Sequence, residues 1–274
     1  MPQINVCDQI ARNILCNNVK QEMSLTLLTL SLSFFGPPTI STKSGGKATL
    51  YGNGPPVVFS SGLYGSMPKF LYNDLFSLMK RNVTFVKMDR PFVTPELLKE
   101  VADALGVEKV GFFSHSSFNP NVLTSPVLNS AVLCDPVVMP NIGLGTNPFT
   151  PPELDITAPV LSIRAELSYD ETKIESSGIP EYLEPRPFDD TKWKMVSYPG
   201  VGHADVLDDM WADMGSSLIP WIHGPDPPKQ PFLNWSPISS KDTGVKDIRK
   251  KYRVALAAMA SNHLLSTIDV LPPV

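Results

Sequence analysis

Three polar side chains that could act together follow strand-like apolar runs, in the order serine, aspartate, histidine. Ser116 follows the run at 109–113, Asp135 follows the run at 131–134, and His203 follows the run at 194–198. A serine hydroxyl becomes a nucleophile when an imidazole accepts its proton and a carboxylate orients that imidazole. Ser116 is therefore the candidate nucleophile and His203 the candidate base. The acid is Asp135 or a carboxylate after a later strand, Asp170 or Glu166.

Strands and helices alternate through the part of the chain that carries these residues. Apolar runs typical of buried strands occupy 56–60, 83–88, 109–113, 131–134, 159–163 and 194–198. A helix is predicted at 68–81, and Thr94, Pro95 and Gly106 mark the start and end of another. Two antiparallel strands, 25–35 and 47–51, precede them, joined by a turn at 44–46.

This alternation predicts an α/β fold, and the order serine, aspartate, histidine along the chain is that of the α/β-hydrolases. Its central sheet is expected to be mostly parallel, with helices on both faces and antiparallel strands at its N-terminal side. In such sheets the functional groups gather at the carboxyl ends of the strands. The residues after those ends, including the glycine-bearing loop at 61–65, are therefore the place to expect a site.

The predicted hydrolase domain covers residues 1–224, with its core at about 24–224. Residues 225–274 are expected to form a Pro-rich linker and a C-terminal helix, at about 245–265, that packs on the same domain. The basic run at 246–253 lies on this helix, and we interpret it as a solvated face.

Three segments resemble stretches of the chlorophyllases, which are α/β-hydrolase-fold esterases that remove phytol from chlorophyll. They are DPV at 135–137, DITAPVL at 155–161 and GHADVLDD at 202–209, and the resemblance covers roughly residues 47–212. It implies a serine carboxylic-ester hydrolase that acts on a small lipophilic ester through an acyl-enzyme, without a metal or organic cofactor.

Carried over by position, the family's catalytic triad falls on Ser116, Asp135 and His203. The same resemblance implies that the backbone N–H groups of Leu63 and Ser117 form the oxyanion hole. It favours Asp135 as the acid, while Asp170 and Glu166 remain the alternatives that other α/β-hydrolases suggest.

The nucleophile turn departs from the family pattern. Where the chlorophyllases have G-H-S-R-G, this chain has S-H-S-S-F, with Phe118 in place of the second glycine. Small residues flank the nucleophile because helix and strand backbones come close together there. The helix after Ser116 is also expected to be short, with two or three turns. The alternative function is therefore a catalytically impaired α/β-hydrolase-fold protein that serves as a binding or interaction protein.

Composition limits the expected partners and location. A net charge of −4 gives no reason to expect nucleic acid as a partner. Three cysteines, an odd number without metal-type spacing, favour a reducing compartment: the cytoplasm or an organelle. The apolar run at 24–36 is too short to span a bilayer as a helix, so a soluble protein is expected. Peripheral membrane contact and the oligomeric state stay open.

Overall fold

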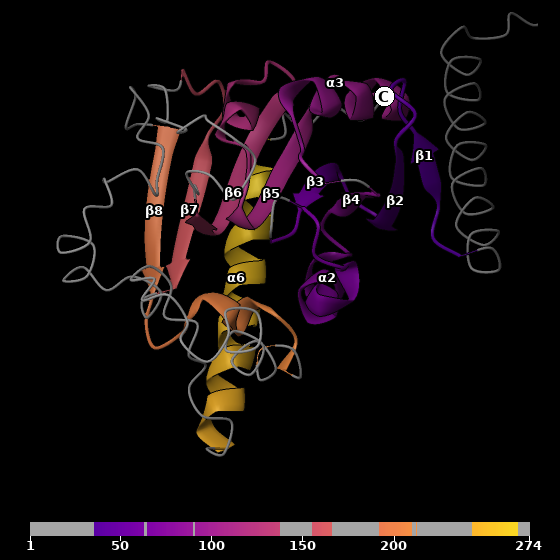
Figure 1. Cartoon of the computed structure of the whole chain (residues 1–274). Helices are drawn as coiled ribbons and strands as arrows, with labels where there is room; N and C mark the ends of the chain where they lie inside the picture. The colour runs from indigo at the N-terminus through magenta and orange to yellow at the C-terminus, as the bar shows by residue number, and fades with distance from the viewer. Residues whose placement is uncertain are drawn as a thin grey trace, which may run out of the picture. The chain divides into compact units, whose positions relative to one another are not determined.

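The computed structural model describes residues 36–62, 65–89, 91–137, 155–165, 192–209, 212 and 243–267, and every structural statement below concerns these. The chain divides into two units, 1–39 and 40–274, and all the described residues except 36–39 belong to the second. Its centre is an eight-stranded sheet in the order β1-β2-β4-β3-β5-β6-β7-β8 (Figure 1). The strands are β1 Thr39–Ser41, β2 Lys47–Gly52, β3 Pro56–Ser60, β4 Thr84–Met88, β5 Val110–Ser117, β6 Leu128–Val137, β7 Val160–Ala165 and β8 Trp193–Tyr198.

The sheet is parallel from β4 to β8, and β2 runs antiparallel to β4. After β3 the chain crosses outward to β4 and then returns to the other side of β3 as β5. From β5 onward, each strand adds next to the one before it. The fold is that of the α/β-hydrolases. The predicted fold class is confirmed, including the antiparallel strands on the N-terminal side.

Helices cover both faces of the sheet. The segments are η1 Lys69–Tyr72, α2 Asn73–Met79, α3 Pro95–Leu105, η2 Pro120–Thr124, η5 His203–Val206 and α6 Thr243–Ser266, where η marks a 3-10 helix. One core cluster joins α2 and α6 to the sheet, and the other joins α3 and η2 to its opposite face. Alternate residues of β3 divide between them, Val57 and Phe59 on one side and Val58 on the other.

The 24-residue helix α6 passes behind β6 in Figure 1 and contributes Tyr252 and Leu256 to the core. Among the described helices, none combines the length and apolar character needed to cross a membrane.

Local signals set the bounds of α3. The Thr94 side chain accepts a hydrogen bond from the Leu97 N–H at 3.2 Å, Pro95 occupies the first turn, and Gly106 ends the helix at φ 67°. A left-handed φ favours glycine because it has no Cβ. This helix begins and ends where the sequence predicts. The helix expected at 68–81 is instead a 3-10 turn followed by the seven-residue α2.

The segment after Ser116 differs most from expectation. β5 does not end at Phe113 but continues through Ser117, because the pairing with β6 extends past the serine. The predicted helix of two or three turns is wrong: its place is taken by η2, a 3-10 helix of five residues. The strand before the turn at 44–46 is the short β1, which the sequence did not predict. The predicted strand at 25–35 lies outside the described residues.

Candidate active site

The three candidate residues lie at the carboxyl edge of neighbouring strands. Ser116 is near the end of β5, Asp135 is near the end of the adjacent β6, and His203 follows β8 as the first residue of η5. The register aligns the residues just before them, because His115 pairs with Cys134. The parallel topology therefore brings residues that are far apart in sequence to one edge of the sheet.

Ser116, the candidate nucleophile, has a left-handed backbone conformation. Its φ is 63°, a left-handed value that is uncommon for a residue with a Cβ. The β5–β6 register shifts between His115 and Ser117, so the serine interrupts the regular pairing. In α/β-hydrolases such a strained turn holds the serine at the top of the sheet. Ser116 itself is 5% exposed.

Asp135 and His203 form a buried hydrogen-bonded pair. One carboxylate oxygen, Oδ2, contacts Nδ1 of His203, and Oδ1 accepts a hydrogen bond from the Ala165 N–H at 3.0 Å. Both side chains are at most 1% exposed. A carboxylate oxygen accepts hydrogen bonds, so Nδ1 of His203 is the donor in this one.

The backbone of Asp135 is also left-handed, with φ 46°. This conformation is uncommon for a non-glycine residue, although aspartate tolerates it better than most. It occurs at the residue whose carboxylate meets both β7, through Ala165, and the histidine that follows β8. The two positive-φ residues of β5 and β6 are thus the candidate nucleophile and the candidate acid.

Phe118, two residues after Ser116, is a core residue. Its side chain is 1% exposed and belongs to the core cluster on the α3 side, with its ring centroid 6.2 Å from that of Phe112. Among the described residues, the segment that follows the strand is the five-residue η2 and not the longer helix that the sequence predicted. The large side chain of Phe118 is thus accommodated in the core beside this short segment.

The loop after β3, of which residues 61, 62 and 65–67 are described, is named here the oxyanion loop after the donor that the sequence analysis predicts in it. The Gly65 N–H donates to the Ser61 carbonyl at 2.7 Å, and the Ser61 hydroxyl donates to the Met67 carbonyl at 2.7 Å. From β4, the half-buried Lys87 donates to the Gly65 carbonyl, and burial lowers the pKa of this lysine. One side chain of the loop, Ser61, and one from β4, Lys87, thus hold the described part of the loop by hydrogen bonds to its carbonyl groups.

Of the remaining predicted site residues, the structure describes only Ser117. Ser117 is the last residue of β5, directly after the candidate nucleophile. Leu63, the other predicted oxyanion donor, lies outside the described residues, as do the alternative acids Asp170 and Glu166.

Helix α6 holds the segment after β8 through hydrogen bonds from two arginines. The sequence analysis did not predict this contact. Asp205 accepts hydrogen bonds from the Gly202 N–H at 2.7 Å and from Nε of Arg249 at 2.6 Å. Arg253 donates to the Leu207 carbonyl at 2.8 Å and to Asp209 at 2.9 Å. These two arginines are 0% and 3% exposed, so the interpretation of the basic run as a solvated face is wrong for them.

That interpretation holds for the other basic residues of the run. Lys246, Lys250 and Lys251 are exposed, and only the two arginines turn inward. Their spacing of four residues, on the face that also carries Tyr252 and Leu256, was the available signal. Charge alone predicted the opposite, because arginine is seldom buried unless it is paired.

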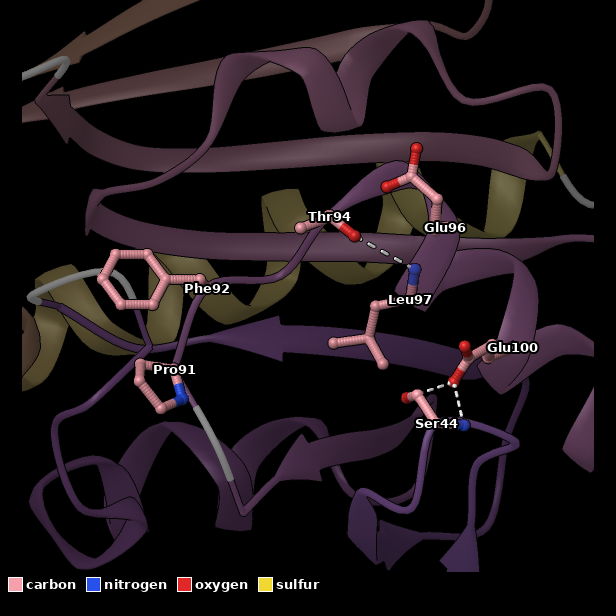
Figure 2. A pocket seen from close by; sticks show the side chains of 7 residues that line it. All are labelled: Ser44, Pro91, Phe92, Thr94, Glu96, Leu97 and Glu100. Atoms are coloured by element: carbon pink, nitrogen blue, oxygen red, sulfur yellow. Dashed lines mark hydrogen bonds between the residues drawn. The ribbon is translucent and has the colours of Figure 1, made fainter. Parts of the chain in front are cut away.

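A pocket of about 330 Å³ lies at the start of α3, away from the candidate residues (Figure 2). It is lined by Ser44, Pro91, Phe92, Thr94, Glu96, Leu97 and Glu100. Figure 2 shows the Ser44 hydroxyl and N–H both directed at the Glu100 carboxylate, at 2.6 and 3.1 Å. Nowhere in the described chain do three or more metal-ligating side chains gather into a group that could hold an ion.

Comparisons with known proteins find similarity at the level of structure alone. No protein-family model and no curated protein sequence matches the chain. Among solved structures, proline iminopeptidase from Mycobacterium smegmatis is 13% identical, with 84% of this chain and 99% of that one covered at a TM-score of 0.46. Naproxen esterase from Bacillus subtilis is 13% identical, with 69% of this chain and 94% of that one covered at a TM-score of 0.41. A bacterial membrane phospholipase A is 12% identical, with 75% of this chain and 93% of that one covered at a TM-score of 0.45.

Proposed function

We propose that the protein is a serine carboxylic-ester hydrolase that acts on a lipophilic ester. The observation that carries the proposal is the buried Asp135–His203 hydrogen bond, formed at the sheet edge where Ser116 adopts a left-handed turn. A base with its tautomer fixed and a nucleophile on a strained turn are the two parts that acyl transfer by a serine needs.

In the proposed reaction, the Ser116 hydroxyl attacks the ester carbonyl carbon while Nε2 of His203 takes its proton. Asp135 stays ionised, and it orients the imidazole and stabilises its positive charge. The backbone N–H groups of Leu63 and Ser117 donate to the oxyanion, and each such donor typically contributes about 3 kcal/mol of barrier lowering.

The tetrahedral intermediate then collapses. The bond to the leaving alkoxide breaks, His203 gives that alkoxide its proton, and an acyl-enzyme remains on Ser116. In the second half, His203 takes a proton from water, the resulting hydroxide attacks the acyl carbon, and the carboxylic acid leaves as the serine recovers its proton.

The substrate class rests on the resemblance to the chlorophyllases. Its most specific segment, GHADVLDD at 202–209, contains His203 together with Asp205 and Asp209, which pair with the two buried arginines of α6. This segment thus carries the candidate base and the carboxylates that anchor it. A lipophilic ester such as the phytyl ester of chlorophyll is the substrate that the resemblance favours.

The alternative, a non-catalytic binding protein, was motivated by Phe118 and the short following helix. Phe118 lies in the core cluster on the α3 side, and this placement supports a working nucleophile turn. The hydrolase is the better supported of the two functions.

A serine-directed fluorophosphonate probe tests the proposal. The wild-type protein should be labelled, and Ser116→Ala should abolish labelling. Ser114→Ala is the matched control, because it removes a fully buried serine hydroxyl two residues earlier on the same strand. Equal labelling of wild type and Ser116→Ala would contradict the assignment. Hydrolysis of p-nitrophenyl esters of increasing acyl length then tests the preference for lipophilic substrates.

A further inference from the structure

A chain of hydrogen bonds crosses the candidate site and joins three of its parts. The Gly62 N–H lies 2.9 Å from the Tyr72 hydroxyl oxygen, and that oxygen lies 2.8 Å from Nδ1 of His115. Nε2 of His115 lies 3.0 Å from the backbone carbonyl oxygen of His203. The Tyr72 and His115 side chains are 0% and 2% exposed. This bridge therefore links the oxyanion loop, the residue before Ser116 and the candidate base.

The chemistry of the groups fixes the direction of every hydrogen bond in the bridge. A carbonyl oxygen only accepts, so Nε2 of His115 must carry the proton. In a neutral imidazole Nδ1 is then an acceptor, and the Tyr72 hydroxyl donates to it. The hydroxyl oxygen in turn accepts from the Gly62 N–H. The Tyr72 hydroxyl also lies 3.7 Å from Sδ of Met67, a longer contact with a weak acceptor, so the nitrogen of His115 at 2.8 Å is the better partner for its hydrogen. Only one neutral tautomer of His115 satisfies the three contacts of the bridge.

Two further observations agree with a neutral His115. Its ring centroid lies 4.9 Å from that of His203, so a charged His115 would oppose the imidazolium that forms on His203 during the proposed reaction. Burial, followed by the nearby His203, lowers the pKa of His115 to about 3. The bridge therefore keeps its hydrogen-bond directions across the neutral pH range.

Gly62 fits the bridge because it has no side chain. A Cβ at this position would lie 2.5 Å from Sδ of Met67 and 3.4 Å from the Tyr72 hydroxyl oxygen. A larger residue here would therefore displace the flexible end of the Met67 side chain, while its contact with the Tyr72 hydroxyl would be an ordinary van der Waals contact. Gly62 also directly precedes Leu63, whose N–H is the predicted oxyanion donor.

We propose that Tyr72 and His115 are positioning residues that hold the oxyanion loop and the candidate base in register with Ser116. The inference rests on the proposed function and adds residues that touch neither substrate nor reacting atoms. Loss of the bridge should act mainly on the transition state, because a displacement of about 1 Å in such a site can lower the rate about 100-fold. It should lower kcat and leave KM nearly unchanged.

Tyr72→Phe tests the inference, because it removes one hydroxyl and keeps the ring that packs in the core. Fluorophosphonate labelling and ester hydrolysis should slow about 10- to 100-fold. Tyr252→Phe is the matched control. It also removes a buried tyrosine hydroxyl, one that contacts Sγ of Cys134 at 3.4 Å, and it should change the rate by less than about threefold. Equal slowing of the two variants would reduce Tyr72 to a packing residue and overturn the inference.

A double variant asks whether Tyr72 and His115 act as one unit. His115→Gln replaces the ring acceptor for Tyr72 with an amide oxygen on a flexible side chain, while offering an amide donor to the His203 carbonyl. If the bridge is a unit, Tyr72→Phe/His115→Gln should be no slower than the slower single variant. Multiplication of the two single effects would mean that the residues act separately, against the inference.

Hydrogen exchange tests the bridge without any activity. Tyr72→Phe should speed exchange in peptides from residues 61–72 and also from residues 198–207, which the bridge reaches through His115. Faster exchange in 61–72 alone would contradict the coupling. Should wild type fail to react with the probe, the proposed function would fail, and the exchange result would still decide whether the bridge exists.

Discussion

Replacement of Arg249 tests whether α6 holds the candidate base in place. Nε of Arg249 lies 2.6 Å from Asp205, and the two side chains are 1% and 2% exposed. Asp205 also accepts from the Gly202 N–H, directly before His203. Arg249→Met keeps an unbranched side chain of similar length in the core but leaves the Asp205 carboxylate without its arginine.

The expected loss is large for a single side chain. Removal of one partner of a buried ion pair typically destabilises a protein by about 3–5 kcal/mol, because the remaining charge is buried without compensation. Folded proteins have a total stability of roughly 5–15 kcal/mol, so the variant should be much less stable and still foldable at low temperature.

Urea unfolding measures the loss as a lower midpoint at unchanged slope. Two variants make the result specific. Lys250→Met changes an exposed cation next to Arg249 on the same helix and should stay within about 0.5 kcal/mol of wild type. Arg249→Met/Asp205→Asn removes both charges and keeps an acceptor for the Gly202 N–H, so it should be more stable than Arg249→Met alone. If the double variant is as unstable as the single one, the buried charge is not the cause.

Two further predictions concern the candidate base and its neighbour. Asp135→Asn should lower kcat about 10⁴-fold in p-nitrophenyl ester hydrolysis, since an amide can hold His203 in the wrong tautomer; a loss below about tenfold would favour another acid. His115 binds a proton below about pH 6.5 in the unfolded chain but not in the folded protein, where burial lowers its pKa to about 3. The free energy of unfolding should therefore decrease as the pH is lowered, by about 1.4 kcal/mol per pH unit between roughly pH 6 and 4. In urea unfolding, the free energy of unfolding of His115→Gln should depend less steeply on pH.

Sequence reasoning located the elements whose bounds depend on near neighbours. β3 was predicted at 56–60, where it is found, because a short apolar run between turn residues is buried on both faces. α3 begins after Thr94 and ends before Gly106, since its cap and its left-handed C-terminal residue are local signals. The alternation of such elements was enough to predict the sheet and the edge at which Ser116 lies.

Sequence reasoning failed where the outcome depends on distant partners. The extension of β5 through Ser117 depends on its pairing with β6, which no local pattern in 114–117 encodes. The burial of Arg249 depends on Asp205, 44 residues earlier in the chain. Likewise, the sequence offered no reason to connect His115 with Tyr72, 43 residues away, because their contact requires the packed sheet.

Phe118 shows how a motif can lose a residue without losing the strained turn. The second glycine of G-x-S-x-G is small because a helix packs closely on the strand there. Here the turn at Ser116 keeps its φ of 63°, while the long helix is replaced by η2, so the constraint on position 118 is gone. The benzyl group fills the core that the short η2 leaves open, and glycine at this position should therefore not improve the site.

Phe118→Ala and Phe118→Gly test this account of the turn. If Phe118 is a core residue, Phe118→Ala should destabilise the protein by about 3–5 kcal/mol in urea unfolding, the usual loss for a buried phenylalanine. Phe70→Ala, at a phenylalanine that is 48% exposed, should cost much less. Fluorophosphonate labelling of folded Phe118→Gly should be no faster than that of wild type. A faster rate would mean that Phe118 obstructs the nucleophile after all, and that the short helix does not compensate for the lost glycine.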